Sequence, residues 1–319
     1  MTRNHLTTLA CAVAIIASVS AVQAQDELKV AVGQINNWEQ QPPTLGQEAG
    51  IYKKHNLVLD NVGTQGAGET IQAVISGSAD IGTGVGVAGA MRAFARGAPV
   101  RLLMPVFTGT GDLYWYVRAD SPLKTVKDAT ERNTVAYSTS GSSSNNIVLA
   151  FVAELGLKAK PTATGGPAST LTQVMSGQID IGWAAPPFGL KEIKEGKIRI
   201  FLRGSDAPSL RGQTVRAAIV NADALKNKKD AVLRFAKGYR DSVDWMYSDP
   251  KAITMYAAKM KLDESLISDS IKQFHPKEAM QTDEMKDMAG IQRDAVALKF
   301  LDKPLTSEQL AEFIQIPPR

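Results

Sequence analysis

Cysteine is almost absent from this sequence, and histidine is scarce. The only cysteine is Cys11, and two of the three histidines are His55 and His275. After residue 24 the chain therefore offers no disulfide and no thiolate ligand, and its fold depends on an apolar core, which its length allows. Neither His55 nor His275 has a second histidine at ligand spacing. We expect both at the surface and no metal site or other cofactor.

Dense runs of one charge are also missing. The formal net charge is +4 over 319 residues, and no basic tract of the kind that binds nucleic acid occurs. The one long apolar run, from Leu6 to Val22, is shorter than the ~20 residues of a membrane-spanning helix. It follows Arg3 and precedes small residues at the positions that a signal peptidase reads. This pattern predicts a secretory leader, residues 1–24, cut after Ala24, and a periplasmic mature protein.

Short apolar runs alternate with amphipathic segments in the first two thirds of the chain. Strands are expected at 28–32, 57–59, 100–106 and 113–117, with a helix at 45–55. This alternation predicts an α/β fold with mostly parallel sheets. Past Val220 the pattern becomes helical. The expected helices are 226–247, 250–260, 264–274, 284–301 and 307–313.

An internal repeat is the most informative feature. Residues 64–89 align without gaps on residues 164–189, with ten identities in 26 positions. Each copy reads as a glycine-containing loop, a helix with an apolar stripe, a glycine that ends the helix, and a short strand. Asp80 and Asp180 recur at the strand starts, where we expect them to accept hydrogen bonds rather than to act as paired acids. The repeat predicts two similar lobes facing each other.

Three segments carry a resemblance to a known family. They are Gly50–Leu57, Ile75–Gly82 and Asp120–Asp128. In these segments and their order the chain resembles the nitrate/sulfonate/taurine-type periplasmic binding proteins of ABC importers. The resemblance implies the type II two-lobed fold, with a ligand cleft between the lobes and a helical C-terminal tail packed across the first lobe. It also implies crossovers at 114–117 and 215–220, a first lobe of residues 25–112 plus 221–319, and a second lobe of residues 113–220.

A serine-rich turn is the best candidate for the ligand site. It follows an expected strand near 134–137 and directly precedes an amphipathic helix, so backbone N–H groups and hydroxyls gather at a helix N-terminus and attract an anion. An ordinary N-cap would need only one serine. The candidate residues here are Ser140, Gly141, Ser142, Ser143 and Ser144.

Loops after other expected strands should also line the cleft, because ligands of open α/β sheets lie beyond the carboxyl ends of strands. Each loop has a plainer interpretation, as a capped surface loop or a tight glycine turn. The candidate residues are Asn36, Asn37, Trp38, Gln65, Gly66, Thr83, Gly84, Trp183 and Pro186.

The expected function is the capture of a small organic anion for a membrane permease, by a monomer without catalytic residues. Members of the family often carry acidic residues near Val85 and Pro186, and here both positions are uncharged. A cationic group would then be costly to bury. We therefore expect a sulfonate or carboxylate over taurine, a thiamine precursor or nitrate. An enzyme on the same fold, either a lyase or a thiamine-pyrimidine synthase relative, and a soluble ligand sensor stay open as alternatives.

Overall fold

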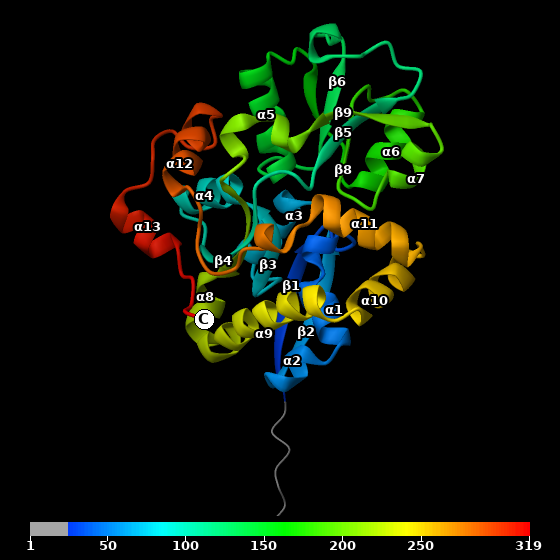
Figure 1. The fold of residues 1–319 in the computed structure, drawn as a ribbon. Coiled ribbons are helices and arrows are strands. Elements are labelled where there is room, and N and C mark those ends of the chain that lie inside the picture. The colour runs from blue at the N-terminus through cyan, green and yellow to red at the C-terminus, as the bar shows by residue number, and fades with distance from the viewer. Residues whose placement is uncertain (1–24) are drawn as a thin grey trace, which may run out of the picture.

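The structure is a computed structural model that describes residues 25–319, so the expected leader lies outside the described residues. Two lobes lie one above the other in Figure 1, each built around its own sheet. The lower sheet has the order β2-β1-β3-β10-β4. Its strands are β1 (Asp26–Gly33), β2 (Leu57–Thr64), β3 (Ile81–Gly86), β4 (Val100–Thr108) and β10 (Thr214–Asn221). All but β10 run parallel to one another.

The upper lobe repeats this arrangement. Its strands are β5 (Tyr114–Arg118), β6 (Thr134–Tyr137), β7 (Lys160–Ala163), β8 (Gly182–Ala184) and β9 (Ile198–Arg203). A parallel bridge between Val135 and Ile181 joins the pair β6-β7 to β8-β5-β9, which gives the order β7-β6-β8-β5-β9. Only β5 is antiparallel to its neighbours. The expectation of mostly parallel sheets is confirmed, and in each lobe the one antiparallel strand lies next to a connection to the other lobe.

Helices cover both sheets. Those of the two lobes are α1 (Pro42–Glu48), α2 (Ile51–Lys54), α3 (Ala67–Ile75), α4 (Val87–Ala95), α5 (Ser143–Leu155), α6 (Pro167–Met175) and α7 (Leu190–Lys194). Short 3₁₀ helices lie at 38–40, 126–128, 204–206, 208–210 and 277–279. The single helix expected at 45–55 is two helices. Gly50 lies between them with φ +74, a left-handed conformation that interrupts an α-helix.

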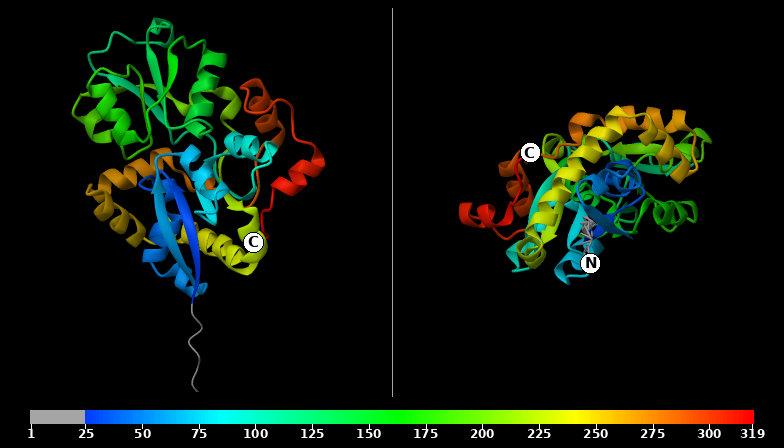
Figure 2. Two further views of the ribbon diagram at one scale, coloured as in Figure 1. Left: turned by 180° about the vertical axis from the view of Figure 1, so that it is seen from behind. Right: turned by 90° about the horizontal axis from the view of Figure 1, so that it is seen from below.

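The C-terminal part is helical, as expected. It comprises α8 (Ala222–Asn227), α9 (Lys229–Ser248), α10 (Lys251–Met260), α11 (Glu264–Phe274), α12 (Met288–Ala297) and α13 (Ser307–Phe313). The long helix α9 packs against α1, β1 and β2, whereas α12 and α13 contact α4, β10 and β4 (Figures 1 and 2). The tail thus wraps the lower lobe. In residues 25–319, none of the helices is both long and apolar enough to cross a membrane.

The repeat is visible in matched hydrogen bonds. Thr64 and Thr70 hydroxyls lie 2.6 Å apart, and so do those of Thr164 and Thr170. Gly77 and Gly177 end their helices with φ of +73 and +79. Both copies thus have the same loop, helix and helix end, and the two lobes share one design.

Asp80 and Asp180 act as the expected acceptors at the strand starts. Asp80 Oδ2 accepts from the backbone N–H of Lys29 at 2.9 Å. Asp180 Oδ2 accepts from the backbone N–H of Thr134 at 2.8 Å. Each aspartate therefore ties the strand that follows it to the neighbouring strand of the same sheet.

The two connections between the lobes lie outside the segments expected for them. Residues 114–117 and 215–220 belong to β5 and β10, paired strands of the two sheets. The chain instead crosses at 109–113 and 204–213. Gly109 N–H donates to Gln213 O, and Gly204 N–H donates to Leu113 O, both at 2.8 Å. The crossovers therefore run side by side, and we propose that the lobes meet there.

Candidate ligand-binding site

Three helix N-termini meet between the lobes. Helices α3 and α4 begin after Gly66 and Gly86 in the lower lobe, and neither has a side-chain cap. Helix α5 begins after Ser142 in the upper lobe. The N–H group of Gly68 in α3 donates to Thr139 Oγ1, just before α5, at 3.0 Å. Because each helix N-terminus carries partial positive charge and free N–H groups, their convergence favours an anion.

The serine-rich turn is built by its own hydroxyls. Ser142 is the N-cap of α5, and its Oγ accepts from Asn145 N–H at 3.0 Å. Ser144 Oγ lies 3.1 Å from Ser138 Oγ and 3.0 Å from Ser142 Oγ, and it accepts from Ser138 N–H. Gly141 supplies the left-handed residue that the turn requires, with φ +83. The several serines thus hold the turn as well as offering hydroxyls to the cleft.

Glycines of α4 let the turn approach. A Cβ atom at Gly89 would lie 2.3 Å from the carbonyl oxygen of Gly141, and one at Gly86 would lie 2.5 Å from the same atom. Both distances are to backbone, which cannot swing away. The contact between the lobes therefore depends on the absence of side chains at these two positions.

A small cavity lies at this meeting point. Its volume is about 20 Å³, room for roughly one water molecule. The lobes therefore lie close together. The expected residues that line it are Asn37, Gly66, Gly84, Ser142, Ser143, Ser144 and Trp183. A larger hollow of about 230 Å³ lies at the edge of the cleft, lined by Asn36 and Gln65 among others, and Gln34 borders both spaces.

The remaining expected residues lie elsewhere. Trp38 is 1% exposed and packs against Tyr256 and Tyr247, to whose hydroxyl its Nε1 donates at 3.0 Å. It is a core residue, so the idea that a ligand stacks on it is wrong. Ser140 and Gly141 line a separate surface hollow beside α4. Thr83 and Pro186 are buried and do not border the cavity.

Arg216 is the main residue that the sequence analysis missed. It lies in β10, is 3% exposed and borders the cavity. Its Nη1 donates to Ser143 Oγ at 3.1 Å, its Nη2 pairs with Asp112, and the guanidinium lies over the Phe107 ring. A single arginine within the otherwise apolar run Val215–Val220 was the available signal. It brings a cation to the serine-rich turn.

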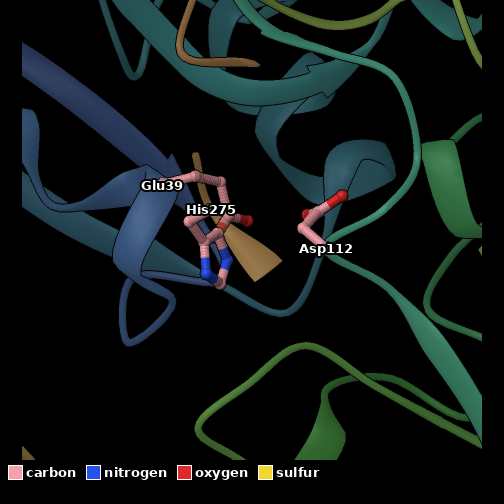
Figure 3. Close-up of side chains that lie close together, drawn as sticks. All are labelled: Glu39, Asp112 and His275. Carbon is pink, nitrogen blue, oxygen red and sulfur yellow. The ribbon is translucent and has the colours of Figure 1, made fainter. Parts of the chain in front are cut away.

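A buried group of charged residues adjoins Arg216. It consists of Glu39, His275 and Asp112, and Figure 3 shows Glu39 and His275 close together with Asp112 facing them; all three are at most 2% exposed. The expectation that His275 lies at the surface is wrong, because α11 ends inside the molecule. His275 Nε2 lies 3.4 Å from Glu39 Oε2. Their closeness could not be derived from the sequence, in which the two residues are far apart.

The two carboxyl groups differ in pKa. Burial raises the pKa of Asp112 above the ordinary aspartate value, and nearby Glu39 adds to this, although Arg216 opposes it. Burial alone would also raise the pKa of Glu39. The neighbouring His275 and the charge of Arg216 outweigh it and hold that pKa below the ordinary glutamate value. Glu39 is therefore a buried carboxylate at the wall of the cavity.

A family model described as NMT1/THI5 like matches residues 37–253, which span most of both lobes. The chain belongs to this family. No protein of the curated set matches it in sequence.

Comparison with solved structures identifies the fold. The alkanesulfonate-binding protein SsuA from Xanthomonas axonopodis pv. citri, bound to MOPS, superposes with a TM-score of 0.75 at 16% identity, over 92% of this chain and 100% of that one. A Candida albicans protein with the generic periplasmic binding protein fold has a TM-score of 0.69 at 15% identity, over 90% and 94%. The nitrate-binding protein NrtA from Synechocystis has a TM-score of 0.69 at 13% identity, over 92% and 86%. The chain has the periplasmic binding protein fold.

Proposed function

We propose that this protein is the solute-binding component of an ABC importer and captures a small organic anion between its lobes. One observation carries the proposal. The guanidinium of Arg216 bonds to Ser143 at the point where three helix N-termini meet. Asp112 neutralises much of the charge of Arg216, so the ligand would be bound mainly by N–H and O–H donors: the guanidinium N–H groups, the serine hydroxyls and the free N–H groups of the helix ends, which suit a carboxylate or sulfonate. The sulfonate- and nitrate-binding proteins of the same fold support an anionic ligand.

Glu39 narrows the ligand class. Val85 and Pro186, the positions where family members often carry acids, are uncharged, but Glu39 borders the cavity. A second negative charge on the ligand would meet this buried carboxylate at low effective dielectric and be repelled. A hydroxyl, amide or amino group would instead find an acceptor. The ligand we propose is an organic acid with one negative charge. Because Glu39 can accept a hydrogen bond, this ligand can also carry an amino group.

The size of the spaces indicates how such a ligand would lie. The enclosed cavity has room for only part of the acid group. The adjoining hollow of about 230 Å³ has room for the rest of an organic ligand. Entry then requires the lobes to move apart about the two crossovers and to close again, a hinge motion whose closed form a permease can recognise. We propose that this capture of the ligand takes place in the periplasm.

A thermal-shift screen tests the proposal, because a ligand that binds only the native state raises the melting temperature. The panel holds alkane and aryl sulfonates, monocarboxylates, dicarboxylates, taurine, thiamine precursors and nitrate. The proposal expects a monoanionic organic acid to give the largest shift and dicarboxylates to give less. No shift with any organic acid would contradict it. Product detected by mass spectrometry would favour an enzyme, and a ligand-dependent complex with a receptor rather than a permease would favour a sensor.

A further inference from the structure

Glu39, Asp112 and His275 form a compact group of potential metal ligands below the cavity. Each residue offers one potential ligand atom, and these three atoms all lie within 4.8 Å of one another. They come from three parts of the chain: the loop after β1, the first crossover, and the end of α11 (Figure 3). We propose that this group binds one divalent metal ion of the zinc type, a site that would hold independently of which solute the cleft captures.

The spacing is close to that of a metal site. Zinc bonds to imidazole nitrogen and carboxylate oxygen are about 2.0–2.2 Å long, which puts tetrahedral ligand atoms about 3.3–3.6 Å apart. His275 Nε2 and Glu39 Oε2 already lie 3.4 Å apart. The ligand atom of Asp112 lies within 4.8 Å of the other two, so a metal ion would draw the three residues slightly closer together. Three protein ligands leave a fourth position open, as in other zinc sites with one exchangeable ligand.

The atoms that would bind the metal have few hydrogen-bond partners. Asp112 Oδ1 and His275 Nδ1 are buried and make no hydrogen bond, and Glu39 Oε2 and His275 Nε2 have only each other, at 3.4 Å. Unsatisfied buried polar atoms are costly, so this cluster points to a missing partner. A metal ion would satisfy one atom of each residue at once.

The other oxygen of each carboxylate is held in place. Asn37 Nδ2 donates to Glu39 Oε1 at 3.2 Å, and Arg216 Nη2 pairs with Asp112 Oδ2. Hydrogen bonds to the outer oxygen orient a ligating carboxylate. The His275 ring is packed edge-on against Phe107, with centroids 6.2 Å apart. The side chains are thus positioned before a metal arrives.

The charges of the cluster favour a bound cation. Arg216 pairs with Asp112, and Glu39 Oε2 faces His275 Nε2 at 3.4 Å. Two arrangements would balance the charge of Glu39: an ion pair with His275, or a metal ion bound between the residues. The ion pair cannot satisfy Asp112 Oδ1 as well. We therefore favour the metal, with the protonated pair as the competing outcome. Access is through the cavity, which Glu39 borders.

The experiment compares the mature protein, free of any tag and stripped with EDTA, with His275→Gln and His55→Gln. His55 is the matched control, because it pairs with Asp241 far from the cluster. Native mass spectrometry with added Zn²⁺ should report one bound ion for the parent and for His55→Gln and none for His275→Gln. The melting temperature of the parent should rise with Zn²⁺ and not with Mg²⁺.

Two results would overturn the proposal. One is that the parent binds no zinc, which would assign the cluster to a protonated ion pair. The other is that His275→Gln binds zinc as the parent does. If His275→Gln does not fold, X-ray absorption of the zinc-loaded parent decides: one nitrogen with oxygen neighbours at about 2.0–2.2 Å supports the site, and any other set contradicts it.

Discussion

Arg216 Nη1 donates to Ser143 Oγ at 3.1 Å, across 73 positions of sequence and from one lobe to the other. Arg216 lies in the sheet of the lower lobe, and Ser143 is the first residue of α5 in the upper lobe. Separation of the lobes would break this bond, and closure restores it. Under the proposed function, Arg216 would therefore contact the ligand and also help to hold the closed form together.

Closure of the lobes should fail when Gly89 becomes alanine. The added Cβ would meet the Gly141 carbonyl at 2.3 Å. Alanine is a better helix former than glycine by about 1 kcal/mol, so α4 itself should tolerate the change. We expect a melting temperature close to that of the parent, a larger radius of gyration in small-angle scattering, and weaker solute binding.

Ala95 on the same helix provides the control for this substitution. Its side chain is exposed, so Ala95→Ser should keep the parent's radius of gyration and affinity. An unchanged radius and affinity in Gly89→Ala would contradict the role assigned to this close approach.

The strand-start aspartates should contribute to stability. Asp80 accepts from Lys29 N–H and pairs with Lys228 Nζ at 2.8 Å. Replacing it with asparagine removes a charge-assisted bond, and we expect a loss of about 1–3 kcal/mol in the free energy of unfolding, measured by urea titration. The exposed Asp60 on β2 serves as control, and Asp60→Asn should leave the unfolding midpoint nearly unchanged. Equal midpoints for both variants would refute the assignment.

The secretory leader predicts a defined mature N-terminus. Protein expressed in a bacterial host and recovered from the periplasm should begin at Gln25, as measured by intact mass. Gln25 Nε2 donates to the Leu57 carbonyl oxygen at 3.3 Å, so this residue is held against the start of β2. A retained leader, or lipid attached to Cys11, would show the prediction to be wrong.

The features that could be predicted from the sequence are those set by residues close together in the chain. The repeat predicted two matching loop-helix-strand units, because glycine, threonine and aspartate recur at fixed places in each copy. The serine-rich turn was predicted from a strand, a glycine and a helix start in sequence. All of these depend on interactions among residues close together in the chain.

Long-range packing explains what could not be predicted. Glu39 and His275 meet because α11 ends against the loop after β1, and no local pattern encodes that meeting. Trp38 was expected in the cleft from its place after a strand, but the tail helices bring Tyr247 and Tyr256 onto it and bury it. Arg216 could have been singled out, since a charge in an apolar strand needs a buried partner.

Calorimetric titration of Ser142→Ala/Ser143→Ala with the best ligand of the screen tests the central claim most directly. Ser140→Ala is the control on the same turn, because its side chain is exposed and outside the cavity. Each hydrogen bond to a charged group is worth about 1.5–3 kcal/mol, so the double variant should bind at least about tenfold more weakly. Loss of the Ser142 cap should lower stability by only about 1 kcal/mol. The account predicts parent-like affinity for Ser140→Ala and this loss for the double variant; parent-like affinity in the double variant would contradict it.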